Sequence, residues 1–179
     1  MNGKRQTIIV PRDKPEFRKA FILMFLIDSY FEAVFLQRER VESERNKEIR
    51  EINFGKLFAD IHFLLVSSTN LLYALKSLKS LLKEDEELAI IYKKYDYDLE
   101  YLSKFRGHLE HITDKRLEGL GKDGQPLKEP NALGDLWGDE YDFGGERFNL
   151  PSSFSMFEKL LGELKRWNAE TLIYPLWNT

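Results

Sequence analysis

Apolar residues recur at helical spacing in four segments of the chain. In the first segment, which follows Pro15, apolar positions lie three or four residues apart until a charged run (RERVESERNKEIRE) begins at Arg38. This pattern predicts a helix over about 15–45. The middle of the helix is apolar on nearly all sides, so we expect other helices, or a second copy of the chain, to cover more than one of its faces.

The segment 53–83 has the most regular spacing. Its apolar positions follow a 4-3-4-3 pattern, which is the contact seam of a helix in a left-handed bundle. Asn53 is the predicted N-cap. At 1.5 Å per residue such a helix is roughly 45 Å long, so the sequence predicts long antiparallel helices. The seam consists of Leu57, Ile61, Leu64, Ser68, Leu71, Leu75, Leu78 and Leu82.

Two further helices complete the predicted bundle. One begins in the acidic stretch KEDEELAII, because acidic residues suit a helix N-terminus, and continues to Ile112. The last begins after Pro151, where Ser155 and Glu158 have the spacing of a capping box. Its apolar stripe runs from Phe154 to Trp167.

A glycine-rich insertion over 119–150 separates these two helices. Within it, EYDFGGERFNL places Gly-Gly between two alternating runs, which predicts a two-residue β-hairpin turn. The register pairs Tyr141 with Phe148, Asp142 with Arg147, and Phe143 with Glu146. Tyr141, Phe143, Phe148 and Leu150 then share the face expected to pack on the bundle, and Glu140, Asp142, Arg147 and Asn149 share the other. The predicted fold class is all-α: one domain, 1–179, an antiparallel bundle of about four long helices with a small β-hairpin in the insertion.

Composition excludes several classes of protein. The 179 residues fit one domain, and a net charge of −3 gives no overall attraction to nucleic acid or anionic membrane. The absence of cysteine excludes disulfides, a thiol nucleophile and a thiolate zinc site. The longest apolar run, FILMFLI, is far shorter than the roughly 20 residues of a membrane span, and the N-terminal stretch does not resemble a signal peptide. We therefore expect a cytoplasmic protein without membrane contact.

Candidate chemistry is concentrated in residues 104–119, KFRGHLEHITDKRLEG. On a helical wheel Phe105, Leu109 and Ile112 define the core side, and Arg106, Glu110, His111 and Asp114 fall on the far side. One interpretation is an ordinary solvated helix face, because Arg106 with Glu110 and His111 with Asp114 have the spacing of surface pairs. The spacing alone leaves this interpretation open.

A second interpretation comes from resemblance to a known family. The string Arg106-Gly-His-Leu-Glu-His111 lies near the end of the third predicted helix and resembles the Arg-x4-6-His signature of the HEPN superfamily. The resemblance extends over about 15–118 and the last helix. It implies an HEPN-like bundle and the activity of a metal-independent endoribonuclease, as in toxins and phage-defence proteins of that superfamily. The position after the arginine is commonly polar in the superfamily and is Gly107 here.

The residues suit cleavage of RNA by its own 2′-hydroxyl. An imidazole with a pKa of about 6.5 can move a proton near neutral pH, which would be the role of His111. The guanidinium of Arg106 can hold two phosphate oxygens. Asp114 could orient the imidazole, with His108 and Glu110 in supporting positions. Lys104, Lys115 and Arg116 raise the net charge of 104–116 to +2, which favours a phosphate. No metal or cofactor is expected.

The predicted partners follow from the same residues. Arg106 and His111 lie about 140° apart around a helix, so one copy presents them splayed. The resemblance implies a homodimer with a composite site at its interface, RNA as substrate and a cognate antitoxin or regulatory protein. Two alternatives remain: a non-catalytic interaction module of the same fold, and a metal site formed by His108 and His111 together with Glu110, Asp114 or His62.

Overall fold

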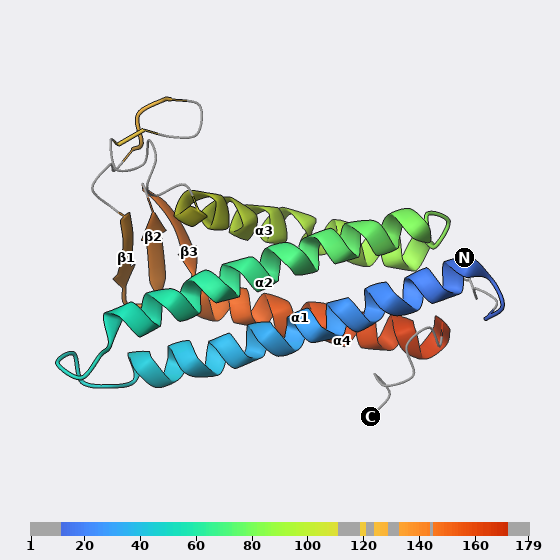
Figure 1. Ribbon diagram of the computed structural model, residues 1–179, viewed down its shortest axis with the longest axis horizontal. Coiled ribbons are helices and arrows are strands. Elements are labelled where there is room, and N and C mark those ends of the chain that lie inside the picture. The colour runs from blue at the N-terminus through green and yellow to red at the C-terminus, as the bar shows by residue number, and fades with distance from the viewer. Residues whose placement is uncertain (1–11, 111–118, 121–123, 129–132, 144, 172–179) are drawn as a thin grey trace, which may run out of the picture.

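The fold is a bundle of four helices with a small sheet at one end (Figure 1). The helices are α1 (Pro15–Arg45), α2 (Phe54–Leu81), α3 (Glu86–Glu110) and α4 (Leu150–Thr171). α1 packs on α2, α2 on α3 and α3 on α4, and α4 also contacts α1. The structure, a computed structural model, describes residues 12–110, 119–120, 124–128, 133–143 and 145–171. It describes the backbone alone for His108, Glu110, Leu133, Gly134 and Trp137.

The predicted helices α1 and α2 are confirmed. α1 has the expected bounds, and the side chain of Asn53 caps α2 by accepting a hydrogen bond from the Lys56 backbone N–H at 3.0 Å. Every residue of the predicted α2 seam is buried, from Leu57 to Leu82. The heptad spacing therefore identified the packing surface of α2 correctly.

The start of α4 differs from the prediction. The helix begins at Leu150, directly after the last strand, and its N-cap is Asn149, whose Oδ1 accepts from the Ser152 backbone N–H at 2.9 Å. The predicted capping box is wrong, because Ser155 lies inside the helix and Glu158 forms an ion pair with Arg38 of α1. Asn149 serves both as the end of a strand and as a helix cap, and such a double role is not visible in the helical periodicity.

The sheet contains the predicted hairpin and one additional strand. Strand β2 (Glu140–Phe143) pairs antiparallel with β3 (Glu146–Asn149) in the predicted register, with Tyr141 opposite Phe148. The predicted inner face is confirmed, because Tyr141, Phe143, Phe148 and Leu150 are all buried. Strand β1 (Leu133–Trp137), which the sequence did not predict, pairs antiparallel with β2, and its register shifts between Leu133 and Asp135. That irregularity breaks the two-residue alternation from which a strand is recognised.

An aromatic cluster attaches the sheet to the bundle. The ring of Phe105 on α3 lies edge-on to Phe148 of β3, with centroids 4.8 Å apart, and 6.4 Å from Tyr141 of β2. Tyr141 also contacts Phe58 of α2 at 6.2 Å. Edge-to-face contacts at these distances are favourable beyond the burial of their area. The cluster fixes the last turns of α3 against both the sheet and α2.

Asp85 joins the start of α3 to α4 at the other end of the bundle. Its Oδ1 accepts from the Leu88 backbone N–H at 2.8 Å, which caps α3, and its Oδ2 accepts from the indole N–H of Trp167 at 3.1 Å. Asp85 and Trp167 are both buried. Each polar atom of this buried pair therefore has a partner, as a core position requires.

Glu44 forms a buried clasp between the end of α1 and the start of α2. Its carboxylate accepts from the Lys47 ammonium at 2.8 Å and from the Asn53 backbone N–H at 2.6 Å, and Lys56 lies 3.5 Å away. The Lys47 hydrogen bond, followed by that of Asn53, lowers the pKa of Glu44 from 4.5 to about 2. A carboxyl whose pKa is lower in the folded chain stabilises the fold when it is ionised.

We therefore expect Glu44 to make the fold sensitive to acid. Its contribution is complete above its ordinary pKa of 4.5 and is lost as the pH falls toward about 2. In Glu44→Gln, denaturant unfolding should show a weaker dependence of stability on pH over that interval than in the wild type. The control is Glu48→Gln, an exposed position nearby, which should keep the wild-type dependence. Equal pH dependence in wild type and Glu44→Gln would contradict the clasp.

Two of the helices are long and apolar enough to cross a membrane by length and composition alone. They are α1 and α2, which differ in burial. In α2, 61% of the most apolar window is buried, as in the core helix of a soluble bundle, whereas in α1 the buried share is 33%. The apolar window of α1 is therefore buried to a smaller extent than that of α2. The prediction that the chain has no membrane span was based on the longest uninterrupted apolar run. It did not consider longer windows in which a few polar residues interrupt the apolar ones.

Candidate functional site

The candidate site begins on the last turns of α3, where Arg106 follows the anchor residue Phe105. Phe105 is fully buried and Leu109 packs against the core, as the helical wheel predicted. Arg106 is partly buried, which differs from the predicted position on the far side of the helix. The buried Leu99 lies seven residues earlier, and seven residues bring a helix back to within about 20° of the same direction. The apolar stripe of the whole helix α3, which includes Leu99, therefore lies closer to Arg106 than a helical wheel drawn from Phe105, Leu109 and Ile112 predicts.

Lys104 lies on the exposed side of the same turn. Its ammonium sits above the ring of Tyr101, 5.8 Å from the centroid, within the range of a cation–π contact. His108 and Glu110 follow on the α3 backbone. The predicted site residues His111, Asp114, Lys115 and Arg116 lie outside the described residues. The structure thus places Arg106 and Lys104 on one rigid helix, and the convergence of the full set stays a prediction.

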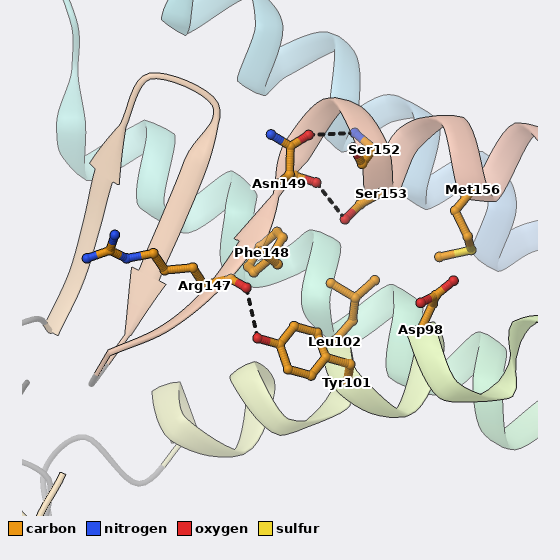
Figure 2. Close-up of a pocket in the computed structure, with 9 residues that line it drawn as sticks. All are labelled: Asp98, Tyr101, Leu102, Arg147, Phe148, Asn149, Ser152, Ser153 and Met156. Atoms are coloured by element: carbon orange, nitrogen blue, oxygen red, sulfur yellow. Dashed lines mark hydrogen bonds between the residues drawn. The ribbon is translucent and has the colours of Figure 1, made fainter. Parts of the chain in front are cut away.

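A pocket of about 250 Å³ lies beside this helix, between α3, β3 and the start of α4 (Figure 2). Figure 2 shows the Tyr101 hydroxyl pointing to the backbone carbonyl of Arg147, while the Arg147 side chain extends away from the pocket. Asp98 and Met156 lie at the opposite side of the pocket from Arg147. The remaining lining residues are Leu102, Phe148, Asn149, Ser152 and Ser153.

Several polar groups of this pocket form structural hydrogen bonds. The Tyr101 hydroxyl donates to the Arg147 carbonyl at 2.8 Å, and Ser153 Oγ donates to the Asn149 carbonyl at 2.9 Å. Asn149 caps α4 with its Oδ1 and donates from Nδ2 to Glu140 at 2.8 Å. Burial raises the pKa of Tyr101, so its hydroxyl remains a protonated donor near neutral pH. These hydrogen bonds join the sheet to α3 and α4, and no histidine among the described residues lines the pocket. We therefore do not assign the pocket a catalytic role.

Tyr101 and Asp142 support the site region, and the sequence reasoning did not identify either role. Asp142 was predicted on the outer face of the hairpin opposite Arg147, and the two side chains do pair at 2.5 Å. Asp142 is nevertheless buried, and it also accepts from the Gly145 backbone N–H at 3.0 Å. The predicted register was the available signal for the ion pair. The burial of Asp142 had no sequence signal, because it occurs in a sheet whose third strand was not foreseen.

Metal ligands do not assemble in the described part of the chain. No group of three or more histidine, aspartate or glutamate side chains there could hold a metal ion. His62, the remaining histidine of the metal alternative, is half-buried on α2 and stacks on Phe63 with ring centroids 6.2 Å apart. His62 is therefore accounted for by packing.

The chain was also compared with known proteins. No protein-family model, curated protein or solved structure matches it. A function for this chain is therefore inferred from its own residues and from the resemblance carried by residues 106–111.

Gly107, next to Arg106, leads to a prediction about stability. A Cβ added at Gly107 would meet no atom within 4 Å, and the same holds for Gly162 on α4. Alanine is favoured over glycine in a helix by about 1 kcal/mol, so Gly107→Ala should raise the free energy of unfolding by about that amount. Denaturant titration measures the change, with Gly162→Ala as the matched control. A Gly107→Ala variant less stable than the wild type would show that the glycine serves a contact or a backbone requirement of its own.

Proposed function

We propose that this protein is a metal-independent endoribonuclease of the HEPN type that cleaves unstructured RNA. The feature that carries the proposal is the string from Arg106 to His111, whose arginine lies on the firmly packed end of the third helix of a four-helix bundle. The order of the helices and the place of the string within them support the resemblance from which the activity was inferred. A toxin or phage-defence component is the role that this activity implies.

The rigid setting of Arg106 supports a role in binding phosphate. Phe105 contacts Tyr101, Phe148 and Tyr141, so the turn that carries Arg106 is fixed before substrate arrives. A preorganised cation stabilises developing negative charge without the cost of reorganisation at the moment of reaction. The partial burial of Arg106 also reduces screening by water, which strengthens its interaction with a phosphate.

The proposed reaction is an internal attack. The ribose 2′-oxygen attacks the adjacent phosphorus, the P–O5′ bond breaks, and the products are a 2′,3′-cyclic phosphate and a 5′-hydroxyl. His111 transfers the proton, Arg106 holds the phosphate oxygens, and Lys104, Lys115 and Arg116 attract the backbone of the RNA. His108, Glu110 and Asp114 are the proposed supporting residues. No metal or cofactor takes part in this scheme.

The proposal includes a homodimer in which both copies contribute to one cleft. Arg106 and His111 are five positions apart, about 140° around a helix, so one copy presents them splayed. Two copies related by a two-fold axis could bring one residue of each kind together. A cognate antitoxin or regulatory protein would restrain the activity in the cytoplasm.

Incubation with RNA tests the proposal. The purified wild-type protein should cut an unstructured RNA in the presence of a chelator and should leave a DNA of the same sequence intact. Complete inactivity toward several RNAs, or activity that the chelator removes, would contradict it.

A second candidate function is a non-catalytic interaction module. The apolar side chains exposed on α1 favour it, because Ile22 and Phe25 are 48% and 52% exposed. Such patches mark interaction surfaces. A folded wild-type protein that never cleaves RNA would favour this candidate over the nuclease.

A further inference from the structure

The pocket between α3, β3 and α4 has more hydrogen-bond acceptors to spare than donors. The Tyr101 hydroxyl gives its only proton to the Arg147 carbonyl. The Ser153 hydroxyl likewise donates to the Asn149 carbonyl. Both hydroxyl oxygens keep lone pairs that can accept a hydrogen bond. Arg147, the only cationic residue among the described residues that line the pocket, extends its side chain away and pairs with Asp142. The lining therefore favours a ligand that donates hydrogen bonds.

Asp98 supplies a negative charge at the edge of this pocket. Its side chain is exposed to water, and it forms no hydrogen bond or ion pair with the described residues. Figure 2 shows its carboxylate pointing from α3 toward Met156 of α4. Near the other end, burial raises the pKa of Tyr101, and the charge of Glu146 raises it further. Lys104, which lies over the Tyr101 ring, is exposed and does not line the pocket. Carboxylate charge therefore acts on both ends of the pocket.

An anion is a poorer occupant, although the pocket lies beside the N-terminus of α4. The first three residues of the helix have no backbone N–H left for a ligand. The Leu150 N–H donates to the Asp139 carbonyl at 2.9 Å, and the Ser152 N–H donates to Asn149 Oδ1 at 2.9 Å. Pro151 has no N–H. The groups that would attract an anion at this end of the helix are therefore already bonded within the fold.

Buried apolar side chains form the interior of the pocket. Leu102, Phe148 and Met156 are 2%, 4% and 9% exposed. With a volume of about 250 Å³, the pocket has room for roughly eight groups of the size of a water molecule, at about 30 Å³ each. A cationic head group on a short alkyl chain has that size, and its chain can pack on the apolar interior. A whole nucleotide is too large for the same space.

We propose that this pocket binds an alkylguanidinium, with its guanidinium on Asp98 and its alkyl chain on Leu102 and Met156. A planar guanidinium can pair with both oxygens of a carboxylate. It is also more weakly hydrated than an ammonium, so less is lost when it enters a partly apolar pocket. The group can belong to a free small molecule or to an arginine side chain of another protein. This inference does not depend on the proposed function.

NMR of the methionine methyl groups tests the pocket at residue level. The chain has three methionines, of which Met156 lines the pocket and Met24 is fully buried in the core. Titration with butylguanidinium should shift the Met156 methyl signal to saturation and leave the Met24 signal unchanged. Butylurea has the same shape without the charge, so it should bind at least about tenfold more weakly. A Met156 signal that does not move at millimolar butylguanidinium, or equal affinity for the two ligands, would overturn the proposal.

Asp98→Asn tests the role of the carboxylate. The variant should bind butylguanidinium about tenfold more weakly than the wild type. Its thermal melting should be unchanged, because Asp98 has no partner among the described residues that the substitution would remove. The matched control is Asp96→Asn, which changes the same residue type two positions earlier on α3 and outside the pocket lining, and which should bind like the wild type. Equal binding by Asp98→Asn and the wild type would overturn the assignment.

A second ligand distinguishes the two sources of the guanidinium. N-acetylarginine amide carries the same head group on a peptide backbone. Tighter binding of butylguanidinium would identify a free small molecule as the occupant, and tighter binding of N-acetylarginine amide would identify an arginine side chain of a protein. Failure of both ligands to bind would overturn the proposal. Arg106→Ala should bind both like the wild type, whether or not the protein cleaves RNA.

Discussion

Arg106→Ala and His111→Ala are each expected to abolish cleavage of unstructured RNA. The first removes the cation that holds the phosphate, and the second removes the group that transfers the proton. Loss of a single charge-stabilising donor typically reduces turnover by about 10²–10³-fold, and loss of a proton-transfer group by about 10²–10⁴-fold. A gel assay on a labelled RNA, with equal amounts of folded protein, measures both effects.

Two controls separate chemistry from folding. Arg106 is partly buried, so its removal should cost about 1 kcal/mol of stability, and thermal melting must accompany the assay. Arg106→Lys keeps the charge but loses the planar, bidentate geometry, and we expect it to restore little activity. His62→Ala changes a histidine on α2 that packs on Phe63, so it should leave cleavage intact. Full activity in His111→Ala would contradict the assigned role.

Phe105→Ala is expected to have the largest effect on stability. Phe105 is fully buried and contacts three other aromatic rings of the described residues, so its truncation should lower the free energy of unfolding by about 3–5 kcal/mol. That loss is a large share of the stability of a single domain. Because the cluster joins α3 to the sheet, the variant should also lose RNA cleavage through unfolding.

Denaturant titration measures the effect of Phe105→Ala. The control is Tyr97→Ala, which removes an aromatic side chain that stacks on Tyr101 from an exposed position. Its cost should stay within about 1 kcal/mol. Leu109→Ala, at a site that packs on the core but is only partly buried, should fall between the two. A Phe105→Ala variant as stable as Tyr97→Ala would show that the cluster does not anchor α3.

The sequence predicted those parts of the fold in which the spacing of apolar residues follows one regular repeat. The 4-3-4-3 spacing of α2 identified its buried seam, because a bundle helix repeats the same contact every seven residues. The hairpin register followed from the Gly-Gly turn, because a two-residue loop determines which residues face each other. Both signals are local, so they do not require knowledge of the neighbours.

The features that sequence missed depend on several elements at once. The alternation of apolar and polar residues along the hairpin placed Asp142 on the outer face, yet Asp142 is buried in the three-stranded sheet. Arg106 is partly buried because it lies on nearly the same side of α3 as the buried residue Leu99, seven residues earlier. The apolar middle of α1 predicted coverage on more than one face, but the bundle leaves Phe25 half exposed. In each case tertiary packing decides the burial, which a single helical wheel does not contain.

The most direct test of the nuclease uses an RNA with one deoxyribose placed on the 5′ side of the scissile phosphate. The 2′-oxygen is the proposed nucleophile, so cleavage at that linkage should stop while neighbouring ribose linkages are still cut, with a chelator present throughout. The fragments from those linkages should end in a 2′,3′-cyclic phosphate. Cleavage that continues through the deoxyribose would show that water attacks the phosphate, and it would contradict the mechanism assigned to Arg106 and His111.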